Sequence, residues 1–205
     1  GLTSAGQQTL TALDSLNGGA GTDTIAVVMK ANATPASDSV EVYTITATAA
    51  ATLNMLGSTG VTSITNTAST NTLTVSNIAL GTTLTLGNTA QGGTFNFAAA
   101  DVAGTADSAT INIESVTGGA LTVGAGVETL TLNSGGSANT LGSLSSGATT
   151  LNITGDQNMT ITGNATATTI DASAATGKIT VTSDNTKAVS ITTGSGADSV
   201  TMTGT

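Results

Sequence analysis

Short segments that alternate between apolar and polar residues recur along most of the chain. Each has the form apolar-polar-apolar, usually with threonine in or beside the middle, and Gly, Asn, Asp or Ser follows. A period of two indicates a β-strand with one buried face. Neighbouring segments commonly lie roughly 8 to 12 residues apart, with turn-forming residues between them and a wider gap near Ala98 to Ser108. Examples are Tyr43–Ile45, Leu73–Val75, Leu84–Leu86, Phe95–Phe97, Ile111–Ile113, Leu121–Val123, Leu130–Leu132, Leu151–Ile153, Met159–Ile161, Ile179–Val181, Val189–Ile191 and Val200–Met202.

Two folds have this spacing, an antiparallel sandwich and a parallel β-solenoid. The strands are short and nearly uniform, and the Asn-Gly and Asp-Gly pairs that form hairpin turns are almost absent. A sandwich core usually holds several aromatic side chains, whereas this chain has one tyrosine, two phenylalanines and no tryptophan. We therefore predict an all-β, right-handed parallel β-solenoid of the β-helix or β-roll type. The side chains predicted to point inward are Leu84, Leu86, Leu130, Leu132, Ile153, Ile161, Val181 and Ile191.

The first residues differ from the rest of the chain. Leu10, Leu13 and Leu16 are spaced by three, which allows a short helix, while the threonines among them favour an extended chain. We therefore expect a short irregular or helical N-terminal segment. The predicted division is an N-terminal segment over residues 1–39 and a Thr-rich solenoid over residues 40–205, which we expect to be a segment of a longer protein.

Composition supports the solenoid. Aromatic residues make up 1% of the chain and charged residues 7%, so an ordinary globular core would be thin. A solenoid needs only one or two aliphatic side chains per strand, because each turn buries the next. Cysteine is absent, so disulfides do not contribute to stability.

The net charge of −9 limits the partners. Lys30, Lys178 and Lys187 are the only basic residues, so we expect no nucleic-acid partner, which would need clustered Lys and Arg. An acidic surface suits divalent cations instead. No apolar run approaches the length of a membrane span, so we expect no membrane insertion.

The residue types also argue against catalysis. Histidine is absent, which removes histidine-based acid–base chemistry and the usual catalytic triad. Arginine is absent as well and lysines are few, whereas a polysaccharide lyase on a β-helix would normally need arginine or clustered lysines beside calcium. We therefore predict that the protein is not an enzyme.

A glycine-rich motif near the N-terminus predicts a calcium site. Residues Gly18–Ile25 read G-G-A-G-T-D-T-I, which fits the calcium-binding β-roll repeat G-G-x-G-x-D-x-U-x, where U is a large apolar residue. Asp23 would supply a hard anionic oxygen, and Gly19 and Gly21 would turn the backbone so that carbonyl groups face the ion. One motif supplies half of such a site. The other half would come from Asp14, a neighbouring turn or another chain.

Two further segments are related to this motif. Gly194–Val200 is an imperfect copy in which Thr193 replaces the first glycine, and it makes Asp198 and Gly196 candidate calcium ligands. Gly124–Leu130 has the same form with Glu in place of Asp, and we interpret it as a turn that leads into a strand. For Asp23 the alternative role is a tight turn in which its carboxylate accepts backbone N–H groups.

The chain resembles RTX-type surface-layer and adhesin-like proteins that Gram-negative bacteria secrete through type I systems. The resemblance is carried by Thr9–Asn17 running into Gly18–Thr24, and by Val127–Leu132, which reads V-E-T-L-T-L. It implies calcium-dependent folding or assembly and a lattice or fibre outside the cell.

The expected function is therefore that of a structural, self-assembling extracellular protein at the bacterial cell surface, with calcium as cofactor. Its expected partner is itself, and a cell-surface polysaccharide is a further candidate. The alternative is a binding module, either an adhesin segment or an ice-binding solenoid with outward threonine rows such as Thr44 and Thr46 or Thr160 and Thr162. The irregular length of the repeats argues against ice binding.

Overall fold

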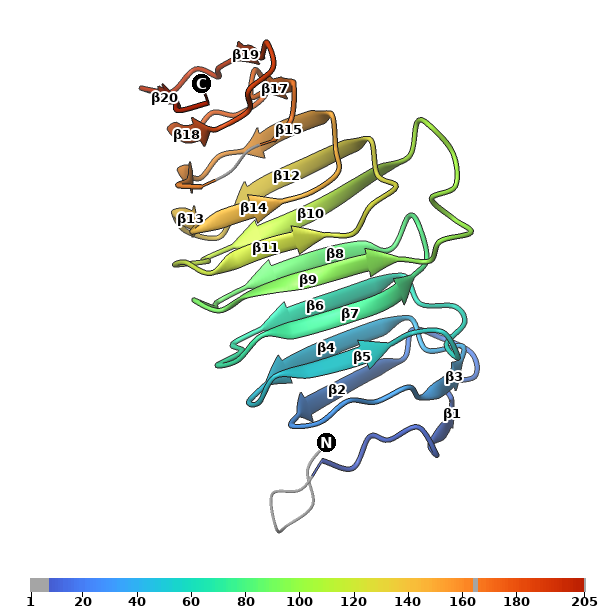
Figure 1. The fold of residues 1–205 in the computed structure, drawn as a ribbon. Helices are drawn as coiled ribbons and strands as arrows, with labels where there is room; N and C mark the ends of the chain where they lie inside the picture. The colour runs from blue at the N-terminus through green and yellow to red at the C-terminus, as the bar shows by residue number, and fades with distance from the viewer. Residues whose placement is uncertain (1–7, 164–165, 205) are drawn as a thin grey trace.

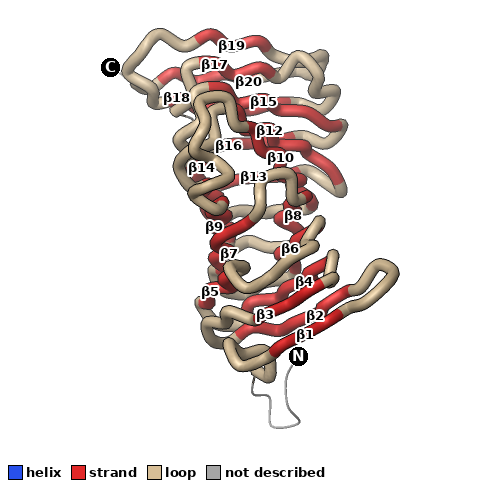
Figure 2. The backbone as a smooth tube through the Cα atoms, turned by 90° about the vertical axis from the view of Figure 1, so that its right-hand side faces the viewer, coloured by secondary structure: helices blue, strands red, loops and turns tan. Residues whose placement is uncertain are grey.

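The computed structural model describes residues 8–163 and 166–204, and it confirms the parallel β-solenoid. The strands of each sheet pair in parallel, and no helix occurs in the described part of the chain (Figure 2). It accordingly holds no helix that could cross a membrane.

The solenoid contains three sheets, each formed by strands from successive turns, and one short pair of strands. The largest sheet has nine strands: β2 Thr24–Met29, β4 Val42–Ala47, β6 Ser63–Thr67, β8 Thr83–Gly87, β10 Ser108–Glu114, β12 Thr129–Gly135, β15 Thr150–Gly155, β17 Thr169–Asp171 and β19 Ser190–Thr192. The five-stranded sheet contains β5 Ala51–Asn54, β7 Leu73–Ile78, β9 Gly92–Phe97, β11 Ala120–Val123 and β14 Ser143–Ser145. The four-stranded sheet contains β13 Asn139–Leu141, β16 Met159–Ile161, β18 Ile179–Ser183 and β20 Ser199–Met202, and β1 Ser15–Asn17 pairs with β3 Ala36–Asp38.

The path of the chain makes a right-handed coil. In Figure 1 the five-stranded sheet lies in front with its strands running to the right, and the nine-stranded sheet lies behind with its strands running to the left. The chain rises from one strand of a sheet to the next as it circles. The first strand of the nine-stranded sheet, β2, pairs with β4, so this sheet continues across the predicted boundary at residue 39.

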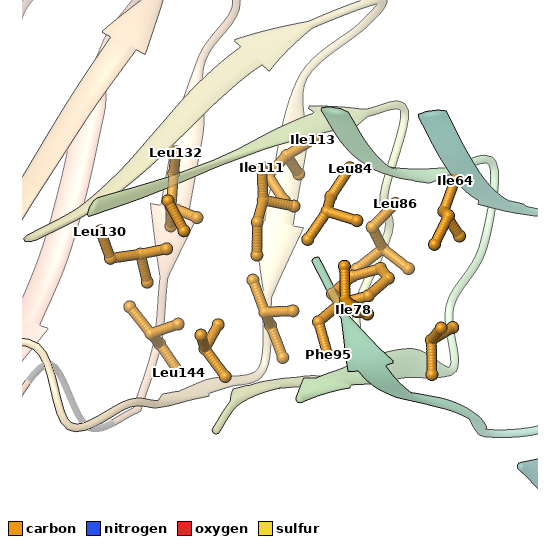
Figure 3. Close-up of a cluster of buried hydrophobic side chains, with 14 of the residues drawn as sticks. Ile64, Ile78, Leu84, Leu86, Phe95, Ile111, Ile113, Leu130, Leu132 and Leu144 are labelled. Atoms are coloured by element: carbon orange, nitrogen blue, oxygen red, sulfur yellow. The ribbon is translucent and has the colours of Figure 1, made fainter. Parts of the chain in front are cut away.

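The core consists of aliphatic side chains stacked in columns. One column runs through Tyr43, Ile64, Leu84, Ile111, Leu132 and Ile153, each paired with the next one turn later. Figure 3 shows Leu84, Ile111 and Leu132 of this column facing side chains of the opposite sheet, among them Phe95. Of the eight side chains predicted to point inward, seven are buried and Ile191 is partly buried against the core.

The turns differ in length, but the strands of the nine-stranded sheet keep their register, whereas β7 shifts register against β9 between Val75 and Ile78. Ser63 pairs with Thr83, 20 residues later, whereas Leu84 pairs with Ile111, 27 residues later. The additional residues form the loop over residues 98–107, which projects from the right side of the solenoid in Figure 1. Insertions therefore go into a corner and leave the sheet unchanged.

One corner of the solenoid repeats the same unusual backbone conformation. Ala68, Asn88, Ser115 and Gly136 occupy equivalent positions in four successive turns, and their φ angles are 51°, 48°, 57° and 69°. This left-handed region is costly for alanine and serine. The chain accepts the cost because the strands on both sides of the corner fix its direction.

The predicted helix is absent from the described residues at the N-terminus. Residues 8–14 form turns and irregular structure, and residues 1–7 lie outside the described part of the chain. Leu10 is buried, whereas Leu13 is 94% exposed, so the leucines do not form one apolar face. The irregular form of the segment is the one observed.

Replacing a side chain of the central column by a charge will destabilise the fold. We expect Leu132→Asp to lower the free energy of unfolding by roughly 4 kcal/mol or more, because it removes a buried leucine and buries an unpaired carboxylate. Chemical denaturation measures the change. The control is Thr131→Asp, whose side chain lies on the outer face of the same strand and should cost about 1 kcal/mol or less. Equal losses in the two variants would contradict the inward assignment.

Candidate functional site

The predicted calcium turn lies between β1 and β2, at the N-terminal end of the solenoid. Gly19 and Gly21 have φ angles of 83° and 121°, a region that glycine adopts without strain. No other atom lies within 4 Å of the position that a Cβ would take at either residue, so the tip of the turn is open. Asp23 follows the turn and immediately precedes β2.

The carboxylate of Asp23 is packed inside this corner. A Cβ at Gly18 would come within 2.8 Å of its Oδ2 atom, so glycine is needed there to make room for the carboxylate. In residues 8–163 and 166–204, Oδ2 of Asp23 is the one buried side-chain polar atom without a hydrogen-bond partner. Such atoms are rare in folded proteins, because burial removes their hydrogen bonds to water and the loss costs free energy when no protein group replaces them.

The next turn places a second acid beside Asp23. Oε2 of Glu41 accepts a hydrogen bond from the backbone N–H of Asp23 at 2.8 Å. The carbonyl of Asp23 accepts one from the N–H of Val42 at 3.0 Å, so the main chains of the two turns are joined at this point. Asp23 and Glu41, the first acid pair, therefore occupy the same corner in successive turns.

The first acid pair fits calcium by the chemistry of its donors. Calcium prefers hard oxygen ligands from carboxylates and backbone carbonyls, and it would satisfy Oδ2 of Asp23. Asp23, Glu41 and the carbonyl groups of the Gly19–Gly21 turn are the groups that would hold it. The described residues contain no group of three or more acidic side chains close enough to bind a metal ion alone, so carbonyl groups or water must complete the coordination.

The same arrangement occurs a second time along the solenoid. Asp107 precedes β10 and Glu128 precedes β12, and Oε2 of Glu128 accepts a hydrogen bond from the N–H of Asp107 at 2.9 Å. In this second acid pair the aspartate is already satisfied, because its Oδ2 accepts the N–H of Gly104 at 3.0 Å. The unsatisfied oxygen thus distinguishes the first acid pair from the second.

The other candidate ligands lie in different environments. Oδ2 of Asp14 accepts hydrogen bonds from the N–H of Thr11 at 2.6 Å and from its hydroxyl at 3.3 Å, so this carboxylate closes a turn. Asp14 and Thr24 line one shallow hollow, which brings Asp14 near the start of β2. Its carboxylate shares no hydrogen bond with Asp23 or Glu41.

Asp198 and Gly196 lie just before β20, and β20 is at the opposite end of the solenoid from β2 (Figure 1). Oδ1 of Asp198 accepts the N–H of Ile179 on the preceding turn at 2.8 Å. A Cβ at Gly196 would meet the carbonyl oxygen of Gly177 at 2.7 Å, so this glycine allows two turns to approach closely. Both residues have a structural contact that is independent of any metal.

Sequence reasoning did not identify Glu41 as the partner of Asp23. It allowed for a ligand from a neighbouring turn, but the distance of 18 residues between the two acids carries no motif. The available signal is positional, because both acids immediately precede a strand of the same sheet. Glu128 was noted in the sequence, and its partner Asp107 could have been found by the same rule.

Comparison of the chain with protein-family models, with curated proteins and with solved structures gave no match.

The packing of Asp23 against Gly18 predicts a steric effect. We expect Gly18→Ala to lower the free energy of unfolding by about 2 kcal/mol or more, because the new methyl group would overlap the carbonyl of Ser39 as well as Asp23. Thermal or chemical denaturation measures this. Gly135→Ala is the matched control, since its nearest neighbour would be 3.9 Å away. If both glycines tolerate alanine equally, the close packing of this corner is wrong.

Proposed function

We propose that this chain is a structural, self-assembling protein of the bacterial cell surface, whose copies associate with the help of calcium. The observation that carries the proposal is the buried Oδ2 atom of Asp23, which has no hydrogen-bond partner among the described residues. It lies in the same corner as Glu41, whose carboxylate accepts the N–H of Asp23. A hard cation bound there would satisfy this oxygen.

Calcium gives this association a switch. Twelve acids against three lysines give the protein a net charge of −9, which keeps copies apart in the absence of cations. The unsatisfied oxygen of Asp23 and the carboxylate of Glu41 are the groups best suited to take up calcium. Binding there would reduce the repulsion and tie two successive turns together.

The extracellular location is supported by the resemblance to secreted surface-layer and adhesin-like proteins. A low content of charged and aromatic residues and a repetitive rod-like fold fit a protein that builds a layer or fibre. A binding module is the second candidate function, because the outer face of the nine-stranded sheet contains two polar hollows.

The calcium role can be tested at the first acid pair. We expect Asp23→Asn to reduce calcium binding in calorimetry and to abolish most of the rise in melting temperature that calcium produces. A site that binds only the folded chain contributes about 2.7 kcal/mol when calcium is 100-fold above its dissociation constant. Glu41→Gln should have the same direction of effect.

Asp14→Asn is the control for this measurement. Its carboxylate closes a turn, so we expect the variant to lower the melting temperature equally in calcium and in chelator. If Asp23→Asn also behaves in that way, Asp23 is a turn residue and the calcium proposal is wrong.

Assembly should depend on calcium at the first acid pair. We expect the protein to remain small in chelator and to form filaments or sheets in calcium at about 1 mM, the range of extracellular sites. Light scattering and electron microscopy follow the change. Asp23→Asn should prevent it, because the variant loses the charged carboxylate of the proposed calcium site.

Asp14→Asn is again the matched control, because it removes the same charge from a carboxylate that closes a turn. It should leave assembly unchanged. A protein that stays monomeric at high concentration with calcium would contradict the structural proposal and favour the binding module.

A further inference from the structure

The outer face of the nine-stranded sheet presents polar side chains in register. They form three columns that run along the solenoid axis, and Asp171 is the one charged residue among them. The columns are Ser108, Thr129, Thr150, Thr169 and Ser190; Thr110, Thr131, Asn152, Asp171 and Thr192; and Thr85, Asn112, Asn133 and Thr154.

Hydrogen bonds between turns hold part of this array in place. Nδ2 of Asn133 donates to Oδ1 of Asn112 at 3.1 Å, and the hydroxyl of Thr154 donates to Oδ1 of Asn133 at 3.1 Å. These bonds limit the rotamers of three side chains in the third column. A ligand that binds there meets groups that are already ordered, which lowers the entropy cost of binding.

The first hollow on this face lies where β8 and β10 separate. β10 pairs with β12 from Ser108 onward, but it pairs with β8 only from Ile111 onward. The gap has a volume of about 360 Å³. Its lining includes Thr83, Thr110 and Asn112. Phe97, whose side chain is almost entirely buried, adds a small apolar surface.

The second hollow lies on the same face, across β12, β15 and the end of β17. It has a volume of about 230 Å³ and is lined by Thr131, Asn152, Thr154, Asp171, Ser173 and Ala174. The hydroxyl and backbone N–H of Ser173 hydrogen-bond to Asp171 and lower the pKa of its carboxyl group. Asp171 therefore offers an ionised carboxylate as a hydrogen-bond acceptor.

The two hollows are aligned along the axis. Thr110 lines the first and Asn152 the second, and they belong to the same column two strands apart. Strands lie about 4.8 Å apart, so this separation is about 10 Å. One strand spacing is similar to the length of a hexose unit in an extended polysaccharide chain.

The lining selects the chemical class of ligand. No lysine lines either hollow, which disfavours an anionic ligand, and one exposed carboxylate is a poor site for a cation. Hydroxyl and amide groups both donate and accept hydrogen bonds, as sugar hydroxyl groups do. We propose that the outer face of the nine-stranded sheet binds a neutral polysaccharide that lies along the solenoid axis with sugar units in the two hollows.

The main competing ligand for such a face is ice. The irregular length of the turns no longer argues against an ordered threonine array, because the strands keep their register. Ice, however, requires a continuous flat array, and two hollows interrupt this one. The observations therefore favour a polymer chain that can place individual units into depressions.

The test uses the whole chain in chelator, where the proposed assembly is switched off, so that failure of either proposal is distinguishable. The probes are cellohexaose, maltohexaose, mannohexaose and chitohexaose, measured by saturation-transfer NMR and calorimetry. We expect at least one of them to bind at millimolar concentration. Thr110→Leu combined with Thr131→Leu should weaken that binding about ten-fold or more, because one polar group is lost in each hollow.

The matched control is Thr74→Leu combined with Thr94→Leu. These threonines are also paired on adjacent turns, but they lie on the outer face of the five-stranded sheet. We expect this variant to bind as the parent does, with both double variants equally folded by melting temperature. The proposal is overturned if none of the four sugars binds, if both double variants lose binding equally, or if the protein shows thermal hysteresis in ice without binding sugar.

Discussion

The whole structure depends on parallel pairing of each strand with the strand one turn earlier and one turn later. This pairing gives the backbone N–H and C=O groups their hydrogen bonds and places similar side chains above one another. A column such as Leu84, Ile111 and Leu132 therefore excludes water with few large residues. A sequence poor in aromatic residues can form a core in this way. Length variation in the nine-stranded sheet goes into the corners, because a shift of one residue within a strand would turn its apolar side chains outward. In the five-stranded sheet, β7 accommodates an extra residue as an irregularity between Val75 and Ile78.

Buried polar side chains occur where the apolar columns are interrupted, and they form hydrogen bonds with neighbouring groups. Asn139 donates to the carbonyls of Ile113 and Gly135 and to the hydroxyl of Ser134, and it accepts the N–H of Val116. A solenoid that satisfies its buried amides so fully makes the unsatisfied carboxylate oxygen of Asp23 more informative. It is the point in the described chain where a hard cation would add most.

Two regions with different chemistry are separated on the solenoid. The first acid pair immediately precedes β2 and β4, which lie near the N-terminal end in Figure 1. The polar columns run from β8 to β19 on the outer face of the nine-stranded sheet. The proposed cation uptake and the proposed ligand binding would therefore use different residues.

The sequence alone determined the fold class and much of the core. A period of two identified the strands and their inward residues, and the glycines before Asp23 required a turn that only glycine adopts without strain. The tertiary structure decided which residues meet. Successive turns differ in length, so spacing in the sequence could not place Glu41 on Asp23 or reveal the hollow between β8 and β10. The left-handed corner at Ala68 and Ser115 was also invisible, because neighbouring strands impose that conformation against the preference of the residues themselves.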